Sequence, residues 1–504
     1  MQNISNWQIP SCFDSATESL QPIKAKVRIP GSKSLTNRYL ILAALSEKPT
    51  IITDALIARD TQLMIAALQS LGCEINITET TLTVSPGKLI GAQIDAGLAG
   101  TVMRFIPPIA ALASGTTIID GDAHARKRPM EEIISALTQL GVSIRKLGSG
   151  EESLPIEIIG TDFAKSSSST LQSPFSAAET KSSANNADPN SAADNANTKS
   201  AANNADFASL TEKTLSLSPK TMPVVKIDAS RSSQFISALL LSAARYPGGM
   251  ELQHQGKKLP SLPHIEMTLE VLREAGVKAE HTSTTPHTWR VFPGVIQQPE
   301  IAVEPDLTNA GPFLAAAMLT SGTVTIQNWP IQKSVQPGLQ YREIFTQMGG
   351  TTNLCDSELT LIGPKTITAL NLDCAEIGEL VPTLAAVAAF AKGTSRFTNI
   401  EHLRGHETDR LAAIAKELQK IGIDAYDEPD ALVIKGVGGN FPSEAKLRNQ
   451  VKAKKITMSA YADHRMATFA ALIGLRIPEL ELDDIAATTK TFPTFVELWQ
   501  EVAS

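Results

Sequence analysis

The sequence predicts an α/β protein built from six copies of one structural unit. The first observation is a helix of small and apolar residues that recurs along the chain and, in most copies, ends before a Gly-containing turn. The second is an amphipathic helix that closes on glycine, and the third is a short alternating strand after most of these helices. Self-similarity with most neighbouring copies about 70 residues apart is typical of a repeat architecture. The first helix of the six copies covers residues 37–45, 101–113, 233–244, 311–320, 380–391 and, more loosely, 464–475.

The second helix is marked by its apolar spacing and its final glycine. In residues 411–421 the apolar side chains recur every three or four positions, and Gly422 follows where a left-handed C-cap is expected. The same pattern ends at Gly141 and Gly349, and a strand is expected directly after each. Any α/β chain alternates helices and strands, but the repeated closure by glycine favours true repeats.

One spacing between copies is too long, and the excess lies in residues 162–220. This segment is rich in Ser, Ala, Asn, Asp and Thr, and residues 181–188 return almost unchanged as residues 199–206. Such a composition cannot bury enough apolar surface to offset the entropy lost on ordering. We therefore expect a solvated, disordered insertion, and removing it restores the spacing of the repeat.

Length, charge and cysteine content exclude several classes of protein. The 504 residues, 42% of them hydrophobic, allow two or three domains with their own cores. A formal net charge of −7 argues against a nucleic-acid-binding protein, which would normally carry a basic excess. The four cysteines are scattered, so disulfide frameworks and zinc sites are not expected. Because the sequence shows neither a signal peptide nor an apolar stretch near the ~20 residues of a membrane span, we expect a cytoplasmic protein.

Small residues, hydroxyls and cations gather where the first helices begin. Free backbone N–H groups and the positive end of the helix dipole favour anions at such positions. Glycine lets a phosphate approach the backbone, serine and threonine donate hydrogen bonds, and lysine and arginine neutralise charge. If several such N-termini converge on one cleft, they would bind an unusually anionic set of ligands. They are Pro-Gly-Ser-Lys-Ser-Leu-Thr-Asn-Arg (residues 30–38), Gly-Leu-Ala-Gly-Thr-Val-Met-Arg (97–104), Asp-Ala-Ser-Arg-Ser-Ser-Gln (228–234) and Asp-His-Arg (463–465).

Each of these stretches has an ordinary explanation when it is taken alone. Residues 30–38 resemble part of a P-loop but lack the GxxxxGK[ST] spacing, which disfavours an ATP site. Ser232 and Ser233 are common N-cap residues, and Arg104 or Arg128 alone would suit a surface ion pair. The functional interpretation rests on the same element standing at the same point of several copies.

Two carboxylates stand among these cations. Glu379 opens the fifth first-type helix, and Glu407 precedes the amphipathic helix that ends at Gly422. Either residue could simply complement a helix dipole or cap a first turn. The alternative is that both transfer protons beside cations that bind substrate.

Taken together, the motifs resemble those of the 3-phosphoshikimate 1-carboxyvinyltransferases, or EPSP synthases, among the enolpyruvyl transferases. They occur in the order of that family and cover nearly the whole chain apart from the insertion. They are residues 30–38, residues 98–104, Arg-Lys-Arg-Pro at 126–129, Ser-Ser-Gln-Phe at 232–235, His-Glu-Thr-Asp-Arg-Leu at 406–411, Asp-His-Arg-Met at 463–466 and Lys-Thr-Phe-Pro at 490–493.

The resemblance implies the enolpyruvyl transferase fold, in which two similar domains each hold three βαβαββ repeats. On this basis domain 1 comprises residues 1–28 and 305–504, and domain 2 comprises residues 29–304. The insertion at residues 162–220 then lies within domain 2, away from every motif.

The resemblance also implies two small-molecule substrates, shikimate 3-phosphate and phosphoenolpyruvate, with no metal or organic cofactor and a monomeric enzyme. The implied catalytic residues are Glu379, Glu407 and Lys33. Shikimate 3-phosphate would be held by Lys33, Ser34, Arg38, Ser232, Ser233, Gln234, Ser261, Glu379, His402 and His406. Phosphoenolpyruvate would be held by Lys33, Gly100, Thr101, Arg128, Gln234, Arg410, His464, Arg465 and Lys490. At Gly100 a larger residue crowds the inhibitor glyphosate in the family, so a sensitive enzyme is implied.

The chain departs from the family at several of these positions. The family often has Asp where Glu379 stands, so the carboxylate reaches one methylene further here. Lys is common in place of His406, whose imidazole titrates near neutrality and need not carry a fixed charge. Asn is common in place of Leu98 and of His402, and Tyr in place of His264.

The sequence disfavours three alternative functions. A UDP-N-acetylglucosamine enolpyruvyl transferase usually has a cysteine in the loop that matches residues 121–128, and none occurs here. An RNA 3′-phosphate cyclase is built from related repeats, but the acidic charge and the lack of a nucleotide-binding histidine motif disfavour it. A non-catalytic phosphosugar-binding module would tolerate loss of Glu379 or Glu407, and both are present.

Overall fold

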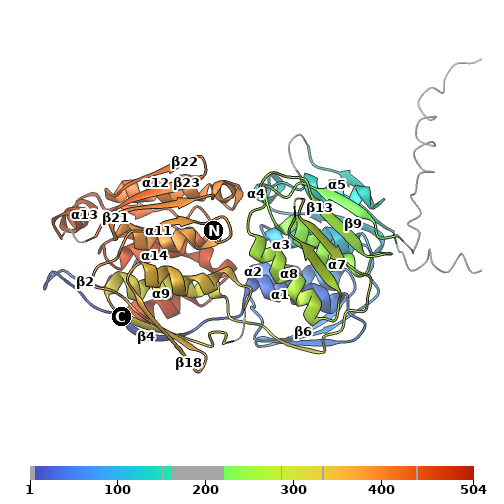
Figure 1. Cartoon of the computed structure of the whole chain (residues 1–504), viewed down its shortest axis with the longest axis horizontal. Helices are drawn as coiled ribbons and strands as arrows, with labels where there is room; N and C mark the ends of the chain where they lie inside the picture. Colours follow the sequence, from blue (N-terminus) through green and yellow to red (C-terminus); the bar gives the residue numbers. More distant parts are fainter. Residues whose placement is uncertain are drawn as a thin grey trace, which may run out of the picture.

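The computed structural model describes residues 6–149, 153–161, 221–284, 286–331, 334–438 and 441–503, so the predicted insertion at residues 162–220 lies outside the described part. Figure 1 shows two lobes side by side, with the chain running between them. One hydrophobic core spans Ile9 to Ile29 and Leu307 to Val502, and the other spans Leu35 to Val303. This division supports our proposal that the domain boundaries lie near residues 28/29 and 304/305, although Ile29 itself packs in the core of domain 1.

Each domain is built from the same sheet, repeated. In the described part of the chain five four-stranded sheets begin with a parallel pair and continue with two antiparallel strands. Domain 2 holds β16 (Glu300–Ala302), β5 (Thr50–Thr53), β7 (Thr81–Ser85) and β6 (Glu74–Thr78); β8 (Gln93–Asp95), β9 (Ser114–Asp120), β11 (Ile156–Thr161) and β10 (Ser143–Lys146); and β12 (Val224–Ile227), β13 (Met250–His254), β15 (Thr288–Val291) and β14 (Ala279–Thr282). Domain 1 holds β4 (Lys24–Arg28), β17 (Thr323–Gln327), β19 (Glu358–Ile362) and β18 (Thr351–Cys355); and β20 (Asn371–Asp373), β21 (Lys392–Thr398), β23 (Ala431–Val437) and β22 (Asp424–Glu428).

The sixth copy is the looser one, as the sequence indicated. Its sheet joins β24 (Thr457–Met458) and β25 (Glu481–Leu482) in parallel, and β1 (Trp7–Gln8) from the start of the chain pairs with β25. A separate hairpin of β2 (Phe13–Asp14) and β3 (Ser19–Leu20) follows β1. Apart from this hairpin, the described residues form six sheets, three in each domain, and this arrangement of three repeats per domain confirms the predicted fold class.

The first helix of each repeat lies inside its domain. These helices are apolar on nearly every side, which is the pattern of a buried helix rather than a surface helix. Most of their residues are buried, and the three helices of each domain pack against one another. They are α1 (Lys33–Ala44), α3 (Gly100–Ala110) and α7 (Gln234–Ala243) in domain 2, and α9 (Leu307–Thr320), α11 (Val381–Ala389) and α14 (His464–Gly474) in domain 1.

The second helices are amphipathic and stop at glycine, as predicted. Gly422 and Gly141 have φ angles of 93° and 82°, and the other three glycines that close these helices also have positive φ. Glycine reaches this left-handed region without the steric cost of a Cβ. The helices are α2 (Arg59–Ser70), α5 (Glu131–Gln139), α8 (Leu262–Glu274), α10 (Tyr341–Gln347) and α12 (Arg410–Ile421).

The remaining described helices are short or peripheral, and none of the helices in the described ranges is long and apolar enough to cross a membrane. They are α4 (Ala123–Arg126), α13 (Phe441–Lys454) and α15 (Phe495–Ala503), with 3-10 turns η1 (Pro337–Gln340), η2 (Gly378–Leu380), η3 (Glu401–Gly405) and η4 (Ile485–Lys490).

The two crossings between the domains are hydrogen-bonded to each other. Gly31 and Pro305 form an antiparallel bridge, and the Ser32 N–H donates to the carbonyl of Glu304 at 2.8 Å. The N–H of Asp306 donates to the carbonyl of Pro30 at 2.9 Å. Each crossing is followed at once by a central helix, α1 in domain 2 and α9 in domain 1.

Candidate active site

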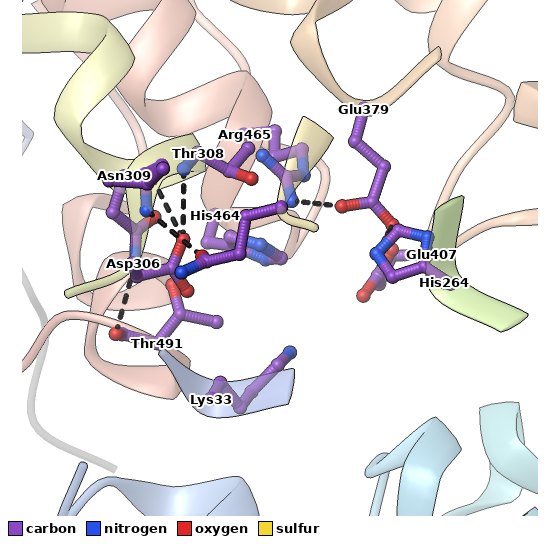
Figure 2. Close-up of polar contacts among 12 residues, drawn as sticks. Lys33, His264, Asp306, Thr308, Asn309, Glu379, Glu407, His464, Arg465 and Thr491 are labelled. Atoms are coloured by element: carbon purple, nitrogen blue, oxygen red, sulfur yellow. Dashed lines mark hydrogen bonds and ion pairs between the residues drawn. The ribbon is translucent and has the colours of Figure 1, made fainter. Parts of the chain in front are cut away.

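A cleft between the two domains is lined by residues from the N-termini of all six central helices. Figure 2 shows part of it, with Lys33 from domain 2 below the residues of α9 and α14. The convergence predicted from the sequence is therefore present in the fold. The cleft is lined by Ser32, Lys33, Ser34, Asp60, Gly100, Thr101, Arg128, Gln234, His264, Met267, Asp306, Thr308, Asn309, Gln336, Pro337, Glu379, His406, Glu407, Arg410, His464, Arg465 and Thr491.

A second, adjoining pocket shares six lining residues with this cleft: Ser34, Thr101, Gln234, His264, Glu379 and His406. It is lined by Ser34, Arg38, Thr101, Phe105, Arg231, Ser232, Ser233, Gln234, Pro260, Ser261, His264, Glu379, His402 and His406. Every residue proposed for shikimate 3-phosphate lies here except Lys33, which lines the first cleft. Every residue proposed for phosphoenolpyruvate lines the first cleft except Lys490. The two predicted sets thus fall in two overlapping cavities, and Glu379 is one of the residues that line both.

The helix N-termini of domain 2 carry uncharged caps. The Ser32 hydroxyl accepts a hydrogen bond from the N–H of Leu35 at 3.4 Å and so caps α1. Ala99 and Ser233, which precede α3 and α7, supply no side-chain acceptor to their helices. At α7 the Ser232 hydroxyl accepts from the N–H of Gln234 at 3.3 Å, whereas at α3 no side chain of the cap residue satisfies the first N–H groups.

Gly100 allows two guanidinium groups to approach the start of α3. A Cβ at this position would lie 3.0 Å from Nη2 of Arg128 and 3.1 Å from Nη1 of Arg104. Arg104 is buried and donates to the carbonyls of Gly100 and Pro129, both at 3.3 Å. Burial and then the neighbouring Arg128 hold the pKa of Arg104 well below its usual range. The surroundings of Arg104 at the start of α3 therefore hold too little negative charge to offset the two guanidinium groups.

Lys33 has one partner, a carboxylate that the sequence analysis did not single out. Its Nζ lies 3.3 Å from Oδ2 of Asp60 at the start of α2. Asp60 also lines the cleft. No sequence signal marked this residue, because 27 positions separate it from Lys33.

Arg38 is engaged by the protein itself. Its Nε donates to the hydroxyl of Thr268 at 2.9 Å, and Nη2 donates to the carbonyl of His264 at 2.9 Å. Nη1 donates to the carbonyl of Ser34 at 2.9 Å. Burial lowers the pKa of Arg38 to about 10. The side chain lines the second pocket while tying α1 to α8.

Two of the three central helices of domain 1 carry aspartate caps, whereas α11 follows Leu380, which supplies no side-chain acceptor. Asp306 accepts from the N–H groups of Thr308 and Asn309, both at 3.1 Å, and caps α9 (Figure 2). Asp463 accepts from the N–H of Arg465 at 2.8 Å and caps α14. Both aspartates directly precede helical segments, so an N-cap pattern could have marked them in the sequence.

A buried ion-pair chain positions Arg410 at the cleft. Its Nε lies 2.8 Å from Oδ2 of the buried Asp463, and its Nη2 lies 2.8 Å from Oε2 of Glu407. The two carboxylates outweigh the effect of burial and raise the pKa of Arg410 above its usual value. Burial favours the protonated form of Glu407, but Arg410 and the surrounding cations hold its pKa well below the usual range. Glu407 is therefore ionised.

Glu379 lies between the domains, held by two basic partners. Oε2 accepts from Nη2 of Arg465 at 2.7 Å, and Oε1 faces Nε2 of His264 at 3.7 Å (Figure 2). Burial favours its protonated form, but His264, when it carries a proton, and the guanidinium of Arg465 stabilise the carboxylate. The pKa of Glu379 stays well below its usual value.

The histidines of the site are neutral at neutral pH. Burial lowers the pKa of His402 to about 4. Burial also lowers the pKa of His264, and it holds those of His406 and His464 well below the usual range. His406, which stands where the family commonly has lysine, therefore adds no fixed positive charge in the absence of ligands.

Lys490 points to the protein backbone. Its Nζ donates to the carbonyl of Ala462 at 2.6 Å, next to the cap of α14. The neighbouring Thr491 lines the cleft instead. Within the described ranges, no group of three or more His, Cys, Asp or Glu residues is placed to hold a metal ion.

Comparison with known proteins agrees with this geometry. A family model described as EPSP synthase (3-phosphoshikimate 1-carboxyvinyltransferase) matches residues 17–184 and 201–499. A 3-phosphoshikimate 1-carboxyvinyltransferase from Kocuria rhizophila is 40% identical over 496 residues, which cover 95% of this chain and 94% of that protein.

Two solved structures share the fold. An EPSP synthase from Acinetobacter baumannii aligns with a TM-score of 0.68 and 20% identity, over 99% of this chain and 98% of that chain. The enolpyruvyl transferase NikO from Streptomyces tendae aligns with a TM-score of 0.64 and 15% identity, over 99% and 97% of the two chains.

Proposed function

The chain belongs to the EPSP synthase family, and on that premise we propose that it transfers the enolpyruvyl group of phosphoenolpyruvate to the 5-hydroxyl of shikimate 3-phosphate. The products are 5-enolpyruvylshikimate 3-phosphate and phosphate, in the biosynthesis of chorismate and aromatic amino acids. The observation that carries the proposal is the pair of overlapping pockets, both lined by Glu379.

Phosphoenolpyruvate carries a phosphate and a carboxylate, and the first cleft offers cations for both. We place it among Lys33, Arg128, Arg410 and Arg465, with the N–H groups at the start of α3 beside it. Guanidinium groups bind such anions with charge-assisted and often bidentate hydrogen bonds. His464, Gly100, Thr101 and Gln234 complete this proposed pocket.

Shikimate 3-phosphate then occupies the second pocket. Its phosphate would meet the hydroxyls of Ser232, Ser233 and Ser261, and its ring would lie against Gln234 and the histidines. Glu379 would stand beside the 5-hydroxyl, because it lines both pockets. Lys33 lies on the phosphoenolpyruvate side and would contact both ligands, as its family position implies.

The chemistry is an addition followed by an elimination. The 5-hydroxyl adds to C2 of phosphoenolpyruvate while C3 gains a proton, and phosphate then leaves as C3 loses a proton. Addition needs a base at the hydroxyl and an acid at C3. We assign Glu379 to the hydroxyl and Glu407, with Lys33, to the exchange of protons at C3.

The cations act mainly by electrostatic stabilisation. Negative charge is held on the phosphate, the carboxylate and the tetrahedral intermediate throughout the reaction. Preorganised cations and N–H groups in a cleft closed to water stabilise that charge without reorganisation. The proposed mechanism uses no metal and no organic cofactor, and this stays a prediction.

A phosphate-release assay with a panel of acceptors tests the assignment. Purified protein given phosphoenolpyruvate should release phosphate with shikimate 3-phosphate and not with UDP-N-acetylglucosamine. The loop at residues 121–128 has no cysteine, whereas enzymes that act on UDP-N-acetylglucosamine usually have one there. Turnover with the nucleotide sugar alone would overturn the proposal.

We further propose that the enzyme acts as a cytoplasmic monomer. One chain supplies both faces of the cleft, so the site is complete without a second copy. Size-exclusion chromatography with light scattering should give the mass of one chain, 53.8 kDa. A stable dimer would contradict the monomeric state and leave the catalytic proposal standing.

A further inference from the structure

His264 is the residue of domain 2 that faces the oxygen of Glu379 not bound by Arg465. Oε2 of Glu379 is taken by Arg465 at 2.7 Å, and Oε1 faces Nε2 of His264 at 3.7 Å. Figure 2 shows the imidazole directly beside this carboxylate. Since α8 belongs to domain 2 and Glu379 to domain 1, the pair spans the cleft.

The position of the imidazole is fixed by its own backbone. The His264 carbonyl accepts from Nη2 of Arg38 at 2.9 Å and from the hydroxyls of Thr268 and Ser237 at 3.0 and 3.3 Å. Three donors on one carbonyl hold the first turn of α8 against α1 and α7. The ring also lines both pockets, so it stands where the two substrates would meet.

Glu379 alone is a weak base. A carboxylate whose pKa lies well below its usual value holds a transferred proton poorly. A general base is most effective when its pKa lies near the working pH. The imidazole 3.7 Å from Oε1 is uncharged at pH 7, because burial lowers its pKa, and its free ring nitrogen can therefore take up a proton.

The surroundings of His264 include charges of both signs. Glu379 and Asp306 favour its protonated form, and Arg38 and Arg465 oppose it. His402 lies close enough to His264 for a charge on His264 to lower the pKa of His402, and His402 is itself neutral at neutral pH. A proton on His264 would lie against the ionised Glu379, which compensates part of the cost of burying the new charge.

We propose that Glu379 and His264 act as one base across the two domains, with His264 as the final acceptor of the proton that leaves the 5-hydroxyl. This assignment rests on the proposed function. It gives His264 a catalytic role in addition to lining the pocket, and it makes the base complete only when both domains face each other.

The proton balance is as follows. The hydroxyl O–H bond breaks as the oxygen bonds to C2 of phosphoenolpyruvate, and the proton passes through Oε1 of Glu379 to Nε2 of His264. This requires the resting imidazole to carry its hydrogen on Nδ1. Because Glu407 is ionised, C3 takes a proton from the ammonium of Lys33 and later returns it to the Lys33 amine, and the proton on His264 leaves with the departing phosphate as hydrogen phosphate.

The test compares wild-type enzyme with His264→Gln, which keeps hydrogen-bonding capacity but has no basic nitrogen. We expect kcat to fall by about 10²-fold, the usual scale for a lost general base. Affinity for shikimate 3-phosphate, measured calorimetrically, should stay within about threefold. The acidic limb of the wild-type kcat profile, where protonation blocks the imidazole, should disappear in the variant.

Two further variants separate a catalytic from a structural role. His264→Asn keeps a polar side chain that can donate and accept hydrogen bonds, but its amide is no base. It should bind shikimate 3-phosphate, react slowly and lack the acidic limb. His124→Gln, at an exposed histidine of α4 that lines neither pocket, should keep both the rate and the profile of the wild type.

The double variant Glu379→Gln/His264→Gln decides whether the two residues form a unit. Groups that act as a unit give losses that do not add, so the double variant should be about as slow as the slower single variant. Additive losses would overturn the inference. So would a His264→Gln enzyme that retains kcat and its acidic limb, or loss of shikimate 3-phosphate affinity by more than about tenfold in both His264 variants.

The experiments distinguish a failure of the proposed function from a failure of this inference. A wild-type protein that releases no phosphate with shikimate 3-phosphate would overturn the proposed function, and this inference with it. An active wild type with an unaffected His264→Gln variant would overturn the inference alone.

Discussion

The two domains present the same helix ends to the cleft but satisfy them differently. In domain 2 the caps before α1, α3 and α7 are Ser32, Ala99 and Ser233, none of them charged. In domain 1 the caps of α9 and α14 are Asp306 and Asp463. The fold is repeated, whereas the electrostatics of the helix ends are not.

This difference assigns separate tasks to the two faces. Uncharged caps leave the N–H groups and dipoles of domain 2 to attract phosphate oxygens directly. Aspartate caps use up N–H groups of α9 and α14, and positive charge on this face is carried by Arg410 and Arg465 instead. Those arginines pair with Glu407 and Glu379, the two carboxylates that we propose as proton-transfer groups.

The largest expected effect comes from the aspartate that supports domain 1. Asp463→Ala removes a carboxylate from the buried Arg410 and also removes the cap of α14. Loss of one partner from a buried ion pair costs about 3–5 kcal/mol of unfolding free energy. Urea unfolding followed by tryptophan fluorescence measures it, since Trp329 and Trp499 lie in the core of domain 1.

Asp409→Ala is the matched control for this change. Asp409 caps α12 in the same domain but is partly exposed, with Arg404 as its ion-pair partner at 2.8 Å. Loss of an exposed cap costs about 1 kcal/mol. Equal losses in the two variants would show that burial of the Arg410 pair is unimportant and would weaken the contrast between the domains.

Glu379→Gln should reduce kcat by about 10²-fold or more, the scale of a lost general base. Glutamine keeps the shape and hydrogen-bonding capacity of the side chain, so affinity for shikimate 3-phosphate should be nearly unchanged. Single-turnover rates and calorimetric titration separate the two effects. Near-native kcat would reduce Glu379 to a helix-dipole residue and require Glu407 to act as the base.

Lys33→Met tests the domain 2 face, where one cation is proposed to serve both substrates. The affinity for each ligand should weaken by about 1.5–3 kcal/mol, the scale of a hydrogen bond to a charged group. Calorimetry measures both values. Lys490→Met is the comparison, because the Lys490 ammonium is bound to the carbonyl of Ala462 and should affect phosphoenolpyruvate alone, and less. Unchanged affinities in Lys33→Met would move the phosphate site away from α1.

Gly100→Ala is expected to have a smaller effect at the same face. The added Cβ would lie 3.0–3.1 Å from the guanidinium groups of Arg128 and Arg104, so these must shift by a few tenths of an ångström. Affinity for phosphoenolpyruvate should fall by about tenfold, or ~1.4 kcal/mol. Gly294→Ala, where no atom lies within 4 Å of the new Cβ, should leave this affinity unchanged. Equal affinities in the two variants would show that the arginines do not need the glycine.

Replacement of residues 162–220 by a short Gly/Ser linker should have the smallest effect. The insertion lies between the second and third repeats of domain 2, and no residue proposed for the site falls within it. Each doubling of loop length changes the closure free energy by only about 0.6 kcal/mol. Steady-state kinetics should therefore show kcat/KM within about tenfold of the full-length chain. A larger loss would give the segment a function.

The repeated fold could be predicted because its signals are local. A helix that ends at Gly422, or an alternating strand after it, is defined within a dozen residues. The binding sets could be proposed because most stand at helix starts, which the topology brings together. Interactions between distant residues gave no such signal. Arg410 and Asp463 lie 53 positions apart, and Glu379 and Arg465 lie 86 apart.

The same limit explains what was missed about individual side chains. Nothing local to Lys490 indicates that its ammonium reaches a backbone carbonyl, and nothing local to Arg38 indicates that protein acceptors surround its guanidinium. The neutrality of His406 depends on burial and on Arg410, which only the assembled cleft provides. The pairing of His264 with Glu379 depends on how the two domains face each other.

The bridge between Gly31 and Pro305 has a consequence for how the cleft could open. If the domains rotate about this short ladder, each atom moves in proportion to its distance from the axis. Lys33 and Asp306 lie within two residues of the bridge, so their separation would change least. Such a pivot would keep the width of the cleft nearly constant next to the bridge. Contacts further from it, such as the salt bridge between Lys258 and Glu401, would be the ones made and broken in every cycle.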